Sequence, residues 1–175
     1  MPVNASYSIN IQANDADPMD LGGSLIRHLF ETNNDWSAGP LTGQVTEAWS
    51  DERTIVAGAF LNLNLASLLA ATGDPRGVGV AFSKVKGIAI LKTTSTDYLT
   101  VGGGTDQTPS ADAFAGVDDY PFQADAAISQ IVDENGVWIW MNPGGATVTV
   151  ATEHILCLGA VTTDQIFKIV ILGNS

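Results

Sequence analysis

The stretch GVWIWMNPGGATVTVATEHILCLGAVTTDQIFKIVILG (residues 136–173) decides the fold of this chain. Its apolar and β-branched residues alternate with polar residues or gather in short runs, as they do in strands that pack on a core. The segments NPGG (142–145) and AVTTD (160–164) separate these runs and have the composition of turns. We therefore predict a run of short strands that forms part of a β-sandwich core.

Similar runs precede this stretch. Residues 45–49, 54–65, 78–92 and 98–101 are apolar or alternating, and they recur at a spacing of roughly ten residues. This spacing predicts an all-β fold, an antiparallel β-sandwich or jelly-roll-like arrangement of about eight strands. SLLAATG (67–73) is compatible with one helical turn before Gly73.

The N-terminal region has a mixed pattern. Residues 5–13 alternate apolar and polar side chains and predict a half-buried strand. Residues 21–30 predict a short helix, with Asp20 placed to favour its start and four apolar residues on one face. These four residues are Leu25, Ile26, Leu29 and Phe30. Residues 31–44 have loop composition, so we expect one or two short helices in a fold that is otherwise strands.

No shift in composition divides the chain. Hydrophobic residues make up 45% and charged residues 15%, and 18 glycines point to a globular fold rich in turns. We predict a single β-sandwich domain over residues 1–175. Within it, residues 1–44 are an N-terminal arm or helix region. Residues 105–123, rich in Asp, Pro, Ser and Ala, are a surface excursion.

The charge balance excludes several classes of partner. Seven Lys and Arg stand against 19 Asp and Glu, a net charge of −12. Binding to a polyanion requires cations that displace its counterions, so nucleic acid and anionic membranes are not expected partners. MPVNASYSIN (1–10) lacks the basic and apolar regions of a signal peptide, and no segment approaches 18 consecutive apolar residues. We expect synthesis in a cytoplasm.

Reactive groups are sparse in the sequence. His28 and His154 are the two histidines, and no G-x-S-x-G segment accompanies either. Cys157 is the single cysteine, and its apolar surroundings, HILCL (154–158), predict a small buried residue. We therefore expect no catalytic residue, no cofactor and no enzymatic activity.

Calcium is the metal that the composition fits best, because its ligands are carboxylate oxygens. Two acidic groups are candidates, Asp15 with Asp17 and Asp20, and Asp112 with Asp118 and Asp119. Neither has the spacing of an EF-hand loop, and acidic loops in an acidic protein are usually solvated. No metal site is predicted.

Two tryptophans fall on one face of a predicted strand. Trp138 and Trp140 share that face, with Val137, Ile139 and Met141 on the other. We expect one face to enter the core and the other to be partly covered by a neighbour. Burial of the tryptophan pair is favoured over an exposed sugar platform or subunit contact.

Six segments of the chain resemble a group of small structural proteins of tailed bacteriophages. They are WSDERT (49–54), LNLNLASLL (61–69), FSKVKGI (82–88), LTVGG (99–103), GVWIWMNPGG (136–145) and FKIVILG (167–173). The group comprises auxiliary β-sandwich components of the virion, of the capsid decoration or cement kind. The resemblance implies a jelly-roll-like fold, no catalysis, and attachment to a capsid lattice.

The resemblance also implies a set of partners. The protein would decorate the outer capsid surface, bridge subunits of the major capsid protein, and form a homo-oligomer such as a trimer. Aromatic and arginine side chains dominate interface energies, which makes them the candidate interface residues. They are Trp36, Trp49, Arg53, Arg76, Trp138 and Trp140. The alternative is a virion spike or lectin-like module that binds host-surface glycan through Trp138, Trp140 or the acidic loops.

Overall fold

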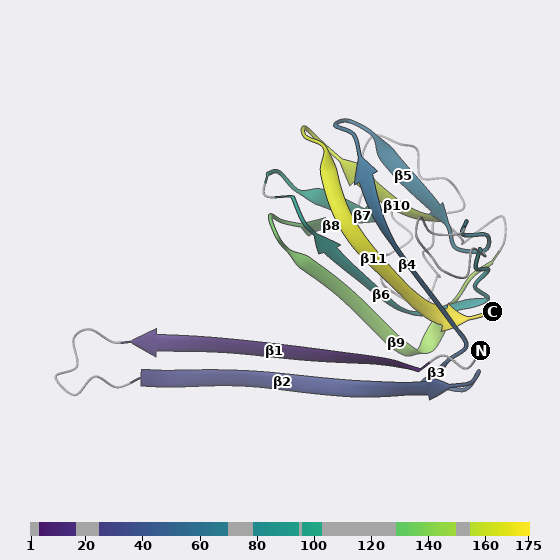
Figure 1. Cartoon of the computed structure of the whole chain (residues 1–175), viewed down its shortest axis with the longest axis horizontal. Helices are drawn as coiled ribbons and strands as arrows, with labels where there is room; N and C mark the ends of the chain where they lie inside the picture. Colours follow the sequence, from purple (N-terminus) through teal and green to yellow (C-terminus); the bar gives the residue numbers. More distant parts are fainter. Residues whose placement is uncertain (1–3, 17–24, 70–78, 95, 103–128, 150–154) are drawn as a thin grey trace.

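The structure, a computed structural model, describes residues 4–16, 25–69, 79–94, 96–102, 129–149 and 155–175. This part of the chain forms eleven strands in three sheets and contains no helix (Figure 1). Two four-stranded antiparallel sheets pack face to face as a sandwich, which confirms the predicted all-β sandwich class. No described segment is a helix long and apolar enough to cross a membrane.

The strands divide among the sheets as follows. The first sandwich sheet has the order β4-β11-β6-β9, made of Glu47–Ile55, Gln165–Asn174, Lys84–Lys92 and Val137–Thr147. The second has the order β5-β10-β7-β8, made of Phe60–Asn64, Ile155–Ala160, Leu99–Gly102 and Ser129–Val132. The third sheet has the order β1-β2-β3, made of Ala5–Ala16, Leu25–Ala38 and Gln44–Val45.

Strand β11 shows why the sequence forms this sandwich. Phe167, Ile169 and Ile171 are buried, whereas Lys168 and Val170 between them are exposed. The strand pairs with β4 on one side and β6 on the other, so its backbone is hydrogen-bonded along both edges. Alternation of period two therefore sets which face of this central strand enters the core.

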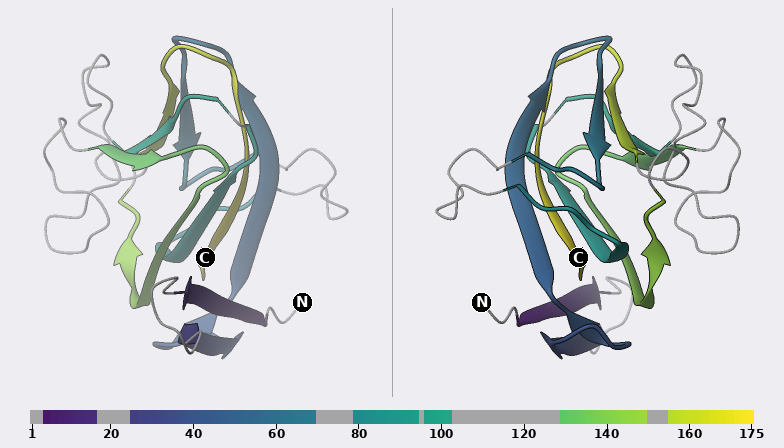
Figure 2. Two further views of the ribbon diagram at one scale, coloured as in Figure 1. Left: turned by 90° about the vertical axis from the view of Figure 1, so that its left-hand side faces the viewer. Right: turned by 90° about the vertical axis from the view of Figure 1, so that its right-hand side faces the viewer.

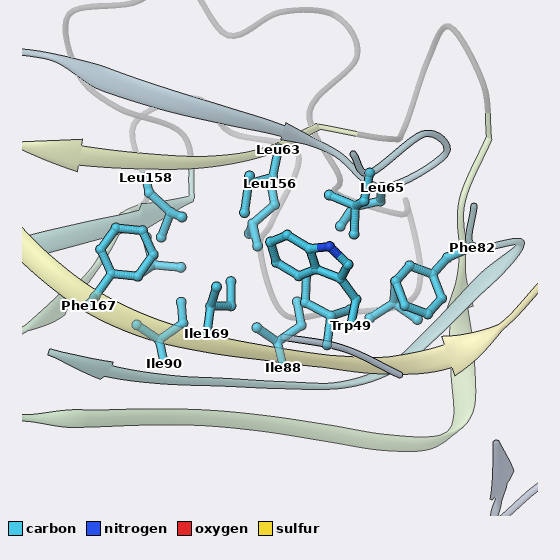
Figure 3. Close-up of a cluster of buried hydrophobic side chains, with 14 of the residues drawn as sticks. Trp49, Leu63, Leu65, Phe82, Ile88, Ile90, Leu156, Leu158, Phe167 and Ile169 are labelled. Carbon is cyan, nitrogen blue, oxygen red and sulfur yellow. The ribbon is translucent and has the colours of Figure 1, made fainter. Parts of the chain in front are cut away.

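The core lies between the two sandwich sheets (Figure 3). Trp49 of β4 is 1% exposed, and its Nε1 donates a hydrogen bond to the carbonyl of Leu69 at 3.0 Å. Isoleucines and Phe167 from the first sheet meet leucines from the second in this cluster, with Phe167 at the opposite end from Trp49 (Figure 3). Trp138 and Trp140 of β9 are partly buried and pack against the same cluster, as predicted for that face of the strand.

Glycine permits a close approach where β11 ends. A Cβ on Gly173 would collide with the backbone oxygen of Lys84, at the point where the β11–β6 register shifts. NPGG (142–145) was predicted as a turn, but it lies inside β9 as a bulge. The register jumps from Gly87↔Met141 to Val85↔Ala146, and Gly145 has φ +79°.

The helix predicted over residues 21–30 is wrong where the structure describes it. Leu25 and Phe30 lie in β2, opposite Ala16 and Ile11 of β1. An isolated helix of ten residues is marginal in water, whereas the described part of the segment forms an inter-strand ladder with β1. The extended ladder also takes in residues 31–38, which were predicted as a loop.

Two further predictions need correction. Residues 67–69 of SLLAATG do not form a helical turn, because Leu68 makes a β-bridge with Val80. Residues 70–73 lie outside the described residues. Cys157 is half-buried rather than buried, since alternation along β10 directs its neighbours Leu156 and Leu158 into the core. The excursion at residues 105–123 lies outside the described residues.

Candidate interaction surface

A long hairpin distinguishes this chain from a plain sandwich. Strands β1 and β2 pair antiparallel from Ala5↔Trp36 to Ala16↔Leu25. Figures 1 and 2 show the hairpin starting near the C-terminal end of β11 and running past β9, beyond the other strands. Its remaining ladder contact is a short parallel pairing with β3.

The hairpin register separates its positions into two faces. One face holds mostly apolar positions, and the other holds mostly polar ones. The apolar face comprises positions Ala5, Tyr7, Ile9, Ile11, Ala13, Ile26, Phe30 and Trp36, together with four more polar positions. In β1 the other face comprises positions Ser6, Ser8, Asn10, Gln12, Asn14 and Ala16. The ladder is therefore amphipathic at the level of sequence and register.

Trp36 joins the hairpin to the sandwich. It is 2% exposed, and a Cβ built on Gly87 of β6 would lie 3.3 Å from its Cη2 and 2.6 Å from the Sδ of Met141. The indole therefore lies over Gly87, on the face of the β4-β11-β6-β9 sheet that points away from the core. We call this the outer face. Within the described residues, the buried Nε1 of Trp36 has no hydrogen-bond acceptor.

The segment between β2 and β4 is also fixed to the sandwich. Lys86 Nζ donates to the carbonyl oxygens of Leu41 and Gln44, both at 2.6 Å. Asn174 Nδ2 donates to the carbonyl of Pro40 at 2.9 Å. Burial lowers the pKa of Lys86, and the charge of Lys84 lowers it further. Trp36 and these contacts together form what we call the junction.

Apolar side chains are exposed on the outer face beside the junction. Val170 of β11 lies opposite Ala89 of β6, which lies opposite Ile139 of β9; in the neighbouring row Leu91 lies opposite Val137. Four of these are solvent-exposed, at 40% for Val170, 39% for Ile139, 41% for Leu91 and 58% for Val137. We call these five residues the outer patch. The register makes it continuous with Gly87 and Met141 at the junction.

A polar network closes the opposite end of the sandwich. The Gln165 side chain is buried and bonds to Thr94, Thr96 and Thr163. Buried Lys92 donates to the carbonyls of Thr94 and Thr96. Each described buried group in this network has a partner, as expected for buried polar atoms.

Asp97 belongs to the same end of the molecule. Its carboxylate accepts hydrogen bonds from the hydroxyl and the amide of Thr162, at 2.6 and 2.9 Å. The Thr162 hydroxyl is the main cause that lowers the pKa of Asp97. These bonds link Asp97 to the turn between β10 and β11.

The predicted interface residues do not form one cluster. Trp49 is a core residue, and Trp138 and Trp140 pack against that core. Arg53 lies on the edge strand β4, where its Nε is 2.5 Å from Asp51 Oδ2. Trp36 lies at the junction, and Arg76 lies outside the described residues.

The outer patch was not predicted from the sequence, because its residues are aliphatic, whereas aromatic and arginine side chains dominate interface energies. A signal for it exists in QIFKIVILG (165–173), where both phases of the alternation contain apolar residues. An amphipathic strand with one solvated face would instead alternate apolar and polar residues. Val170 departs from that pattern, and so does Ile139 between two tryptophans that face the core.

The candidate metal and catalytic residues are dispersed. Among the described residues, no three His, Cys, Asp or Glu side chains lie close enough together to hold a metal ion. Asp15 is in β1 and His28 is in β2. The other candidates lie outside the described residues: Asp17, Asp20, Asp112, Asp118, Asp119 and His154.

Comparison of the chain with models of protein families, with curated proteins and with solved structures finds no match in any of the three. Function is therefore inferred from the residues and their geometry.

Proposed function

We propose that this chain is a non-enzymatic structural protein of a tailed-bacteriophage virion, which decorates or cements the outer capsid surface by bridging subunits of the major capsid protein. The observation that carries the proposal is the outer patch beside a projecting hairpin. Contiguous exposed apolar side chains on a folded protein mark a surface that contacts another protein. The resemblance of residues 49–173 to capsid decoration proteins supplies the kind of partner.

The sandwich provides a rigid support for such contacts. Among the described residues, its core contains 21 buried hydrophobic side chains, packed between the two sheets. Loops and arms that project from a rigid scaffold can then reach a neighbour while keeping a defined position. The hairpin and outer patch lie on one side of this scaffold, which gives the molecule a contact side.

The charge of the chain supports a position outside the shell. A net charge of −12 repels packaged DNA, and an internal protein that faces the genome would gain from positive charge. On the exterior the same charge keeps particles apart in solution. The acidity therefore favours the outer surface over the lumen.

Repetition on a lattice would strengthen weak contacts. A standard interface buries about 1,600 Å², and a homo-oligomer that touches several capsid subunits gains effective concentration at each further contact. A modest patch on each chain is then sufficient for stable attachment. This is the physical basis for a cementing role.

The glycan-binding alternative gains no support from the geometry. A sugar platform requires the faces of Trp138 and Trp140 to be open to solvent, and both indoles pack against the core. Ile139, the residue between them, is exposed and aliphatic. We therefore do not propose a lectin-like function.

Imaging of virus particles tests the proposal. Particles made with and without the gene for this chain should differ by density on the outer surface, and particles without the chain should release DNA at a lower temperature. Purified protein added back should co-sediment with the deficient particles and restore the density. Identical reconstructions and identical thermal release of DNA would overturn the proposal.

A further inference from the structure

The outer patch lacks a covering layer among the residues that the structure describes. The outer patch is exposed although it belongs to the two central strands and one edge strand of a sheet. The hairpin passes the sheet without covering this patch, since Val137 and Ile139 remain 58% and 39% exposed. An isolated two-stranded hairpin is marginal in water unless another layer packs on it.

The outer patch and the apolar face of the hairpin have matching character. Trp36 occupies the apolar face of the hairpin ladder and lies over Gly87 of the outer face, so the ladder's apolar face is the one nearer the sandwich. Both surfaces consist of alternating strand positions, which is the arrangement that packs when one sheet lies on another at about 10 Å. The hairpin face and the outer patch are therefore both mostly apolar and both suited to packing of one sheet on another.

We propose that the apolar face of the β1-β2 hairpin of a second copy of this chain packs on the outer patch, and that the copies exchange hairpins in a closed homo-oligomer. The smallest such assembly is a dimer with twofold symmetry, in which each copy both gives and receives a hairpin. This inference concerns the isolated protein and does not depend on a capsid.

The area available is sufficient for a stable assembly. Strand β1 has 12 residues and therefore spans about 40 Å, and a two-stranded ribbon is about 10 Å wide. A whole hairpin face covers about 400 Å², and its Trp36 end already packs on its own sandwich. Two reciprocal contacts therefore bury up to about 1,600 Å², the size of a standard specific interface.

The charge of the chain favours this apolar contact over a polar one. Each copy has a net charge of −12, so two copies repel each other at long range. Contact through a mostly apolar hairpin face adds one carboxylate position, Asp15, and salt screens the remaining repulsion. We therefore expect association to become tighter as ionic strength rises.

The unpaired Trp36 Nε1 is a second sign that the junction is incomplete in one chain. It is buried and has no acceptor among the described residues, although a buried indole N–H usually has one. The indole lies where the hairpin meets the outer face, next to the space that a second hairpin would enter.

Sedimentation of the purified full chain is the first test. The wild type should have the mass of a dimer or a larger closed ring at tens of micromolar. Val170→Asp places a short carboxylate in the centre of the contact and should raise the dissociation constant by at least about 100-fold, since an unpaired buried charge is costly. Val161→Asp is the matched control, because Val161 is similarly exposed at 43% but lies in the β10–β11 turn. It should associate as the wild type does.

A mixing experiment identifies the contact itself. One chain carries Ile11→Cys in the hairpin and another carries Ile139→Cys in the outer patch, both with Cys157→Ser, so that each chain has one thiol. Oxidation of the mixture should give a disulfide-linked pair that neither chain forms alone.

Three results would overturn the inference. They are a wild type that is monomeric at every concentration and salt, a Val170→Asp oligomer as tight as the control, and a mixture without the hairpin-to-sheet crosslink. A crosslink in Ile139→Cys alone would show that the sheets meet face to face, which also contradicts hairpin exchange.

Discussion

The sandwich and the hairpin are built from the same secondary structure but are stabilised in different ways. In the sandwich, every strand packs one face on the opposite sheet, and residues such as Phe167 and Ile169 are fully buried. In the hairpin, β1 and β2 pair with each other along twelve positions and are attached to the sandwich at one end. Hydrogen bonding suffices to define a ladder, but a stable layer needs a second layer against it. The chain supplies that second layer for the sandwich, and we propose that a second copy supplies it for the hairpin.

Removing the core indole should have the largest effect. Trp49→Ala leaves a cavity between the two sheets and should lower the free energy of unfolding by about 3–5 kcal/mol. Trp36→Ala is the matched comparison, because Trp36 is equally buried but lies at the junction. It should lower the unfolding free energy less and should increase protease cleavage within the hairpin.

Urea unfolding and limited proteolysis of both variants measure these effects. Equal losses of unfolding free energy in the two variants would show that the junction is part of the same cooperative core. The separation of the molecule into a body and an attached hairpin would then be wrong.

The pH dependence of stability tests the contribution of Lys86, which lies at the junction between the hairpin and the sandwich. Because burial and Lys84 lower its pKa, the unfolded chain binds the Lys86 proton more tightly than the folded chain does. Stability contributed by this group therefore rises with pH between its lowered pKa and the ordinary value of 10.5. Lys86→Met lacks this term and also loses the two bonds to Leu41 and Gln44.

Urea titration from pH 7 to 10 measures the unfolding free energy of both proteins. The value for the wild type minus the value for Lys86→Met should increase as pH rises. Lys84→Met, which removes an exposed neighbouring charge, should raise the pKa of Lys86 and reduce the slope. A pH-independent difference would contradict the assignment of the shift to Lys86.

Substitution of Asp97 should have the smallest effect on stability. This effect should be confined to the end of the sandwich that lies opposite the junction. Hydrogen bonds from Thr162 lower its pKa below the ordinary 3.8, so its contribution is present above that pH and is lost as pH falls through the lowered value. Asp97 has φ +59°, which Asn tolerates better than Ala. Asp97→Asn therefore removes the charge with little backbone strain.

Thermal unfolding from pH 6 to 2.5 should show the wild type slightly more stable than Asp97→Asn at the upper end, with the gap closing in acid. Asp97→Ala should be less stable than Asp97→Asn at every pH because of its backbone conformation. Hydrogen exchange in the hairpin should be unchanged in both. A gap that does not narrow as pH falls below 3.8 would contradict the role of the charge.

The sequence predicts the sandwich well because its alternation has a single interpretation. In β11, Phe167 and Ile169 are buried and Lys168 between them is exposed. A helix would not place residues 167 and 169 on one face and residue 168 on the other. Leu25, Ile26, Leu29 and Phe30 are less decisive, since their spacing fits a helical face and the extended ladder with β1 is visible only in the structure.

The outer patch was harder to predict, because its residues resemble core residues. Trp49 was expected at an interface on residue type, yet a large aromatic is equally suited to the centre of a core. Val170 and Ile139 have the composition of core positions, and their exposure depends on which sheet face lies opposite another layer. Only the strand order and register place them together with Trp36 on one side of the molecule.

Hydrogen exchange of the full chain at several protein concentrations tests the central claim most directly. The account predicts that amides of β11 are protected at every concentration, whereas hairpin amides beyond the junction gain protection only as the chain associates. In Val170→Asp the hairpin should stay unprotected at concentrations where the wild-type hairpin is protected. A hairpin that is as protected as β11 in the dilute monomer would contradict the claim that its second layer comes from a partner.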